Sequence, residues 1–110
     1  MACSKYFGLL LALPLAASTV RIIQTNSAGD DVSVIDPASN KVVGTINGIE
    51  VNHGAAAAPD GSRYYISDEG QSTLDVVDRK TLEITRRIRL SGHPNNIAIS
   101  NRRGNKVLNR

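Results

Sequence analysis

The chain repeats itself after 42 residues without a gap, and this repeat limits its fold more than any other feature of the sequence. Residues 32–67 align with residues 74–109, and most apolar positions of the two copies match in class. Identical residues recur at the aligned pairs Val34 and Val76, Asp36 and Asp78, Ile46 and Ile88, and Ala56 and Ala98. Such self-similarity indicates one structural unit that recurs and buries its apolar face against a neighbouring copy.

Each copy consists of short apolar runs separated by turn sequences. In the first copy and the residues before it, the runs cover residues 21–25, 32–35, 41–46 and 55–58. The intervening residues are rich in Asp, Asn, Pro and Gly, which favour tight reversals of the backbone. A period of about 40–45 residues with four such strands is typical of a β-propeller blade. The sequence therefore predicts an all-β fold of antiparallel four-stranded blades, an incomplete propeller of about two blades and part of a third.

The alanine run at residues 55–58 could form either a helix or a strand. Alanine is the strongest helix former, but the run aligns with residues 96–100, which carry β-branched isoleucines that favour strands. Small side chains also suit the innermost strand of a blade, where the blades converge. We therefore predict a strand, followed by a hairpin turn at residues 59–62 in which Gly61 takes a positive φ.

Residues 1–18 differ in composition from the rest of the chain. One lysine precedes an apolar run at residues 7–17, and Ala16 and Ser18 are small residues at the spacing that a signal peptidase requires. The run is shorter than the roughly 20 residues of a membrane helix, and a buried N-terminal helix is the alternative to an export signal. We predict a signal peptide at 1–18, with a signal helix, a partial propeller domain at 19–110, and a periplasmic or secreted location.

The composition and the distribution of charge exclude several kinds of protein. Of the 110 residues, 41% are hydrophobic and 21% are charged, which excludes a disordered chain and one embedded in a membrane along its length. Arg86, Arg87 and Arg89 are expected on an outermost strand, where cations guard an exposed edge against pairing with other chains. Attraction to an anionic surface is the alternative role of these arginines.

Several runs of the sequence resemble the YVTN-type β-propeller repeat. These runs are Ile23–Asn26, Val32–Val42, His53–Gly61, Tyr65–Asp68 and Leu74–Asp78. Where the first copy has Pro-Asp-Gly, the second departs from the pattern with Asn101-Arg102-Arg103 and a late Gly104. The resemblance covers the predicted mature domain but does not separate functions, because the family includes surface-layer proteins, periplasmic binding propellers and domains similar to redox enzymes.

The resemblance implies an exported propeller segment that acts as a binding or scaffolding module in the cell envelope. Closed propellers have about four to eight blades, so we expect a fragment of a longer propeller; self-association through open blade edges is the alternative. The second hypothesis is the cofactor-binding propeller of a periplasmic oxidoreductase similar to haem nitrite reductase or quinoprotein amine dehydrogenase. The sequence carries no catalytic motif, so it decides neither enzyme activity nor the identity of a cofactor.

The expected partner is a protein or a small-molecule ligand of unknown identity. With only three tyrosines and one phenylalanine, the chain lacks the aromatic surface on which bases stack, so nucleic acid binding is not expected. The apolar run near the N-terminus is too short for a membrane span, so we expect a chain that does not cross a membrane.

Candidate ligand-binding residues lie where the innermost strand of each blade begins. His53 occupies this position in the first copy, and His93, Asn95 and Asn96 occupy it in the second, with Asn95 aligned to His53. In a propeller these connections ring the mouth of the central channel. An imidazole with a pKa near 6.5 can bind a metal or haem, or can transfer a proton. The alternative is a histidine that orders its own loop by donating to a backbone carbonyl.

The acidic residues are expected to have structural roles, and no catalytic or metal-binding residue is assigned. Asp36, Asp60 and Asp78 stand at turns, where a carboxylate accepts hydrogen bonds from backbone N–H groups. A calcium site could be imagined at Asp30, Asp31, Asp68 and Glu69, but these residues lack the alternating ligand pattern and the glycine of an EF-hand loop.

Overall fold

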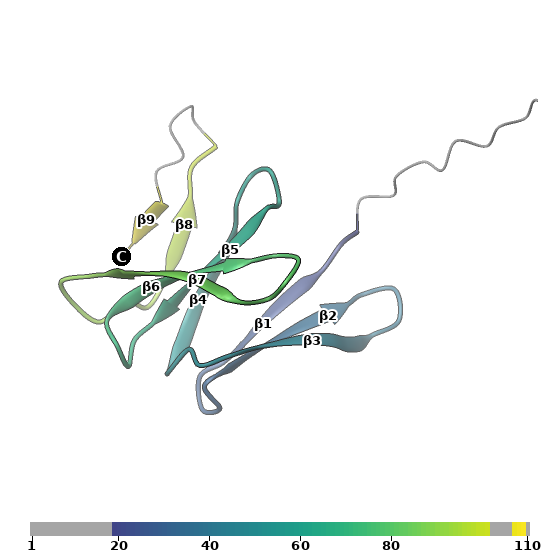
Figure 1. Cartoon of the computed structure of the whole chain (residues 1–110), viewed down its shortest axis with the longest axis horizontal. Helices are drawn as coiled ribbons and strands as arrows, with labels where there is room; N and C mark the ends of the chain where they lie inside the picture. The colour runs from purple at the N-terminus through teal and green to yellow at the C-terminus, as the bar shows by residue number, and fades with distance from the viewer. Residues whose placement is uncertain (1–18, 102–106, 110) are drawn as a thin grey trace, which may run out of the picture.

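The computed structural model describes residues 19–101 and 107–109, which form three antiparallel sheets (Figure 1). The first sheet consists of β1 (Ile22–Asn26), β2 (Asp31–Asp36) and β3 (Lys41–Asn47). The second consists of β4 (Asn52–Ala57), β5 (Arg63–Asp68), β6 (Thr73–Asp78) and β7 (Ile84–Arg89), and the third of β8 (Ile97–Ile99) and β9 (Val107–Asn109). The predicted all-β fold of antiparallel blades is confirmed. The predicted signal peptide, and residues 102–104 of the departure from the repeat, lie outside the described residues.

The second sheet is a complete four-stranded blade. Its strands follow one another in chain order, and Tyr65 lies between Ala56 on β4 and Val76 on β6. The alanine run is therefore extended, as predicted, because Tyr64 and Ile66 on β5 offer a buried surface on which a narrow strand packs. The predicted hairpin is also confirmed, with Gly61 at a φ of 72°.

The innermost strand begins earlier than the sequence predicts. β4 starts at Asn52, so His53 lies within the strand and not in the connection before it. Asn52 pairs with Asp68 on β5, and the Ser67 hydroxyl accepts a hydrogen bond of 2.8 Å from the Gly54 N–H across a bulge. These polar contacts extend the strand through residues that lack the apolar pattern of a strand.

The backbone of the first sheet repeats that of the second in detail. The alignment places β1, β2 and β3 on β5, β6 and β7, and both sheets have a bulge at the same point, after Val34 and after Val76. Positive φ angles also recur, at Asp30 and Ser72 and at Asn40 and Leu82. The described part of the first sheet has three strands instead of the predicted four, because no described strand occupies the position that β4 occupies in the second sheet.

The hydrophobic core lies between the first and second sheets. It consists of Val32, Val34, Ile46, Ile49, Tyr64, Ile66 and Val77, each at most 4% exposed. Burial of one such side chain contributes about 1.5–3 kcal/mol, so the two sheets stabilise each other through this interface. Leu82 packs against the cluster from the β6–β7 turn and reaches into the space that a side chain at Gly44 would fill.

Candidate ligand-binding site around Glu69

His53 forms a short hydrogen bond with Glu69, the residue that follows β5. The Nε2 atom of His53 lies 2.7 Å from Glu69 Oε2, and both side chains are about one-third exposed. The two residues meet because β4 begins beside the end of β5. Since a carboxylate only accepts hydrogen bonds, Nε2 carries the proton, and the neutral ring keeps a lone pair on Nδ1.

His93 approaches the same residue from the next repeat. It lies in the connection between β7 and β8, and its Nδ1 atom is 3.3 Å from the backbone oxygen of Glu69. The carbonyl accepts this hydrogen bond, so the neutral ring keeps its lone pair on Nε2. The two histidines predicted from the repeat thus converge on one residue, Glu69, which was not identified from the sequence as a ligand-binding residue.

Asn95 and Asn96 lie beside this group with exposed side chains. The backbone oxygen of Asn95 accepts a hydrogen bond of 3.0 Å from the buried Ser67 hydroxyl. A Cβ atom at Gly54 would lie only 2.7 Å from that oxygen and 2.9 Å from the Ile97 nitrogen. The close approach fixes the connection through its backbone, so both amide side chains are left at the surface.

A buried asparagine holds the site against the first sheet. Asn52 is fully buried and accepts a hydrogen bond of 2.7 Å from the Asn26 N–H. Its amide donates to the Asp31 and Ile49 carbonyls at 3.0 and 2.8 Å. These bonds satisfy the whole polar end of Asn52 and make a rigid base under the neighbouring His53.

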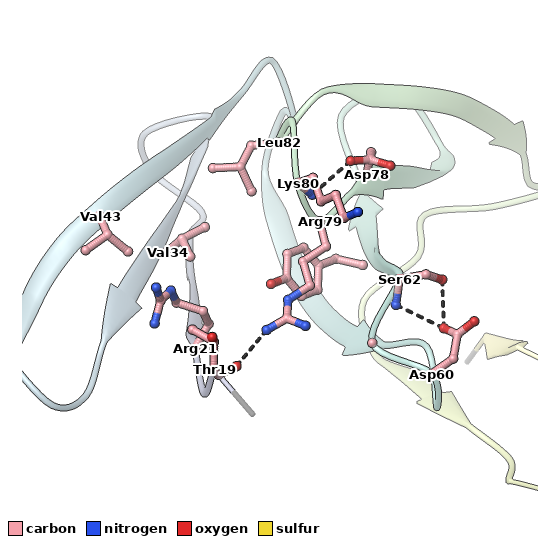
Figure 2. A pocket seen from close by; sticks show the side chains of 12 residues that line it. Thr19, Arg21, Val34, Val43, Asp60, Ser62, Asp78, Arg79, Lys80 and Leu82 are labelled. Carbon is pink, nitrogen blue, oxygen red and sulfur yellow. Dashed lines mark hydrogen bonds between the residues drawn. The ribbon is translucent and has the colours of Figure 1, made fainter. Parts of the chain in front are cut away.

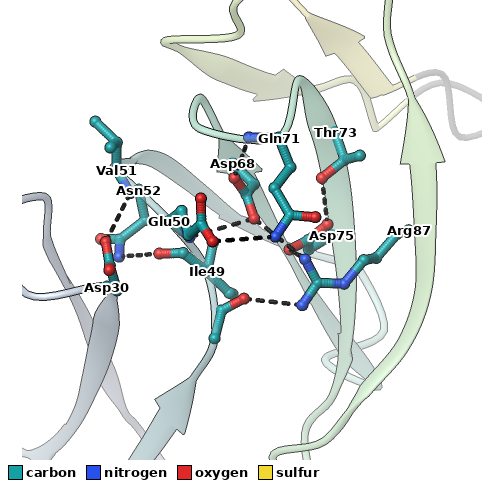
Figure 3. Close-up of polar contacts among 11 residues, drawn as sticks. Asp30, Ile49, Glu50, Val51, Asn52, Asp68, Gln71, Thr73, Asp75 and Arg87 are labelled. Atoms are coloured by element: carbon teal, nitrogen blue, oxygen red, sulfur yellow. Dashed lines mark hydrogen bonds and ion pairs between the residues drawn. The ribbon is translucent and has the colours of Figure 1, made fainter.

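A charged cluster lies beside this base, and the sequence did not predict it (Figure 3). The Nη1 atom of Arg87 lies 3.3 Å from Asp68 Oδ2 and 3.4 Å from Asp75 Oδ2, and both carboxylates are fully buried. Its Nη2 atom donates to the Gly48 carbonyl at 2.8 Å, which ties β7 to the connection before β4. Arg86, Arg87 and Arg89 all lie exposed on β7, the outermost strand of the second sheet, as predicted. The guanidinium of Arg87 also compensates buried charge, which the sequence did not predict.

Asp75 carries the least compensated charge in this cluster. Burial raises its pKa to about 6, while a hydrogen bond from the Thr73 hydroxyl and the charge of Arg87 act in the opposite direction. Its Oδ2 atom accepts no hydrogen bond from a described residue. The aligned position of the first sheet is Ser33, whose hydroxyl lies 3.1 Å from the Asn26 amide, so the charge belongs to the second sheet. The signal that could have revealed this cluster is Asp75, an acidic residue within the apolar run of β6.

The turn carboxylates have the roles predicted from the sequence. Asp36, Asp60 and Asp78 each accept a hydrogen bond from a backbone N–H of their own turn. No group of three or more His, Cys, Asp or Glu residues in the described ranges could hold a metal ion. No helix in these ranges is long and apolar enough to cross a membrane.

No family model matches the chain, and no curated protein matches it. Among solved structures, the chain is similar to hydrazine synthase from Kuenenia stuttgartiensis, with 25% sequence identity and a TM-score of 0.71. The likeness covers 74% of this chain and 23% of the hydrazine synthase chain. Hydrazine synthase contains a β-propeller, and the likeness agrees with the blade architecture described above.

Proposed function

We propose that the chain is a segment of an exported β-propeller that binds a polar ligand where His53, Glu69 and His93 meet. The observation that carries this proposal is the convergence of histidines from successive repeats on one residue. Ligand sites commonly combine a rigid base with a few polar groups that converge. The buried Asn52 supplies such a base here.

The ligand is expected to carry hydrogen-bond donors. Neutral His53 and His93 each keep one nitrogen lone pair that accepts no hydrogen bond from a described residue. Glu69 adds a carboxylate, and the amides of Asn95 and Asn96 are exposed nearby. A hydroxyl- or amine-bearing small molecule, or a protein loop with such groups, fits this set.

The resemblance to the YVTN-type repeat supports a binding or scaffolding role in the cell envelope. The described sheets have three, four and two strands, whereas closed propellers contain about four to eight blades. A longer propeller would supply the neighbouring blades that complete these sheets and cover their faces. We therefore propose that the binding site lies at the rim of a larger ring.

The likeness to hydrazine synthase favours a second candidate function, the cofactor-bearing propeller of an oxidoreductase. This candidate rests on 25% identity over 74% of the chain. His53 and His93 would then be the residues that approach the cofactor, after His53 exchanges its bond with Glu69 for a new partner. Haem binding by the chain would favour this oxidoreductase candidate over a binding module without a cofactor.

The test is a titration of the ¹⁵N-labelled chain with fragments that carry hydroxyl or amine donors, and separately with hemin. Saturable shifts at His53, Glu69 and His93 that disappear in the double variant His53→Ala, His93→Ala are expected for the binding module. Gln24→Ala, an exposed change on β1, is the control. Histidine-dependent hemin binding would favour the oxidoreductase, and shifts confined to other residues would contradict both candidates.

Export is tested by expression of the full chain in an exporting bacterial host. We expect intact mass spectrometry of the released protein to show loss of roughly the first 18 residues, as the small residues before Thr19 predict. A full-length product confined to the cytoplasm would contradict the proposed location.

A further inference from the structure

A groove opens at the opposite ends of the strands from His53 and Glu69 (Figure 2). It has a volume of about 810 Å³ and lies between the first sheet and the β4–β5 and β6–β7 turns of the second. Val34, Val43 and Leu82 contribute apolar surface to its wall. Sites for small molecules commonly measure roughly 300–1,000 Å³ and combine an apolar wall with a few polar groups.

Three cationic side chains line the groove, and one of them, Arg79, has no carboxylate partner among the described residues. The Nη2 atom of Arg79 donates to the Thr19 carbonyl at 2.6 Å, whereas the charge of Lys80 acts on Asp78. Arg21 lies 3.6 Å from Asp36, outside hydrogen-bond distance. Half-buried Arg79 thus carries a positive charge that a bound anion could compensate.

The two carboxylates in the groove are occupied by their own turns. Asp60 accepts hydrogen bonds from the Ser62 N–H and hydroxyl at 2.9 and 2.7 Å. Asp78 accepts hydrogen bonds from the Lys80 and Thr81 N–H groups at 2.8 and 2.9 Å. These turn contacts direct the carboxylates to the backbone, and the charge of Lys80 adds to the hydrogen bonds that lower the pKa of Asp78. The charged groups of the groove sum to a net positive charge.

Tyr64 adds a hydrogen-bonding group to the wall of the groove. Only 4% of this residue is exposed, and it lines the groove. Its hydroxyl forms no hydrogen bond with a described residue and is not among the buried polar atoms without a partner, so it is open to solvent at the groove. A solvent-accessible hydrogen-bond donor therefore lies at the wall of the groove that also contains Arg79.

We infer that this groove binds a small organic anion, a carboxylate or phosphate group on an apolar body. The guanidinium of Arg79 suits such a group because its planar fork can bind two oxygens at once. The Tyr64 hydroxyl donates a further hydrogen bond, and the valines and Leu82 hold the apolar body. The site shares no residue with the group around Glu69, so it does not depend on the function proposed above.

Two probes test the inference on the ¹⁵N-labelled chain: phenyl phosphate, and benzyl alcohol as its uncharged counterpart. Phenyl phosphate is expected to shift the amide signals of Gly61, Ser62, Arg79 and Lys80 saturably, and benzyl alcohol to bind at least about tenfold more weakly. Arg79→Gln should weaken phenyl phosphate on the order of tenfold, since it removes a charged hydrogen bond. Benzoate in place of phenyl phosphate shows whether the groove prefers a carboxylate.

Two further variants complete the experiment. Tyr64→Phe keeps the buried ring and removes only the hydroxyl, so weaker binding with an unchanged spectrum is expected. Arg86→Gln removes an exposed arginine that does not line the groove and should bind as the wild type does. Equal binding of benzyl alcohol, or equal effects of Arg79→Gln and Arg86→Gln, would overturn the inference. Shifts at His53 and Glu69 alone would also overturn it, while leaving the proposed function intact.

Discussion

At the scale of single residues, buried charge distinguishes the second repeat from the first. The second repeat has charged residues where the first has uncharged ones. Asp68 aligns with Asn26 on β1, Asp75 with Ser33 on β2, and Arg87 with Thr45 on β3. A buried ion pair contributes little net stability, although removal of one partner is costly. Because burial raises the pKa of Asp75 in this cluster, the stability of the second repeat should depend on pH.

The pH dependence of this cluster is predicted to come from Asp75. Its folded pKa of about 6 lies above the ordinary value of 3.8. The folded state thus keeps a proton that the unfolded state loses, and the free energy of unfolding should fall as the pH rises from about 4 to 6. Asp75→Asn should raise it at pH 7.5 by about 1–3 kcal/mol, and less at pH 5. Urea denaturation at both pH values checks this, and an equal change at both values, or a loss of stability at pH 7.5, would contradict it.

The opposite result is expected for the cation of the cluster. Arg87→Gln leaves two buried carboxylates without their guanidinium and should lower the free energy of unfolding by about 3–5 kcal/mol at neutral pH. Arg86→Gln, at the exposed neighbouring position on β7, is the matched control and should change it by less than about 0.5 kcal/mol. Similar losses in both variants would mean that Arg87 acts only at the surface.

At the scale of elements, the repeat predicted the strands well because period and turn chemistry are local. The strands around Val34 and Val76 were placed within one or two residues, and the hairpin at Gly61 followed from its turn sequence. The start of β4 was missed because Asn52 and Gly54 are held by contacts with other strands, not by an apolar pattern.

The candidate site was only half predictable for a related physical reason. Alignment of the copies identified His53 and His93, but Glu69 joins them through the pairing of β4 with β5, which the repeat alone does not specify. The contacts of Arg87 likewise depend on strand pairing, which brings Asp68 and Asp75 within reach of its guanidinium. Sequence period shows which positions face inward, whereas the contacts between elements decide which side chains meet.

The junction between the second and third sheets depends on the absence of a side chain at Gly54. Gly54→Ala would place Cβ against the backbone of Asn95 and Ile97 and should separate β8 from β4, at a cost of about 1–3 kcal/mol. Gly92→Ala is the control, because nothing lies within 4 Å of its Cβ position. Amide shifts of β8 that change in the first variant alone would confirm the junction, and identical spectra would contradict it.

At the scale of the whole molecule, the sheets are arranged as successive blades that share their interfaces. The first and second sheets enclose the core, and the third contacts β4 through its first strand (Figure 1). Repeat units of this kind draw most of their stability from contacts with neighbours. Changes at one sheet are therefore expected to alter the stability of the next.

The hydrogen bond between Asn26 and Asn52 makes this dependence visible at one amide. The Asn26 N–H points away from β2 and donates to a side chain on the first residue of β4. Its proton can therefore exchange with solvent once β4 detaches, even while β1 and β2 stay paired. We expect the Asn26 amide to exchange at the rate at which the second sheet opens. In Asn52→Ala, exchange at Asn26 should no longer follow the opening of the second sheet. One backbone proton in the first blade would thus report on the opening of the second.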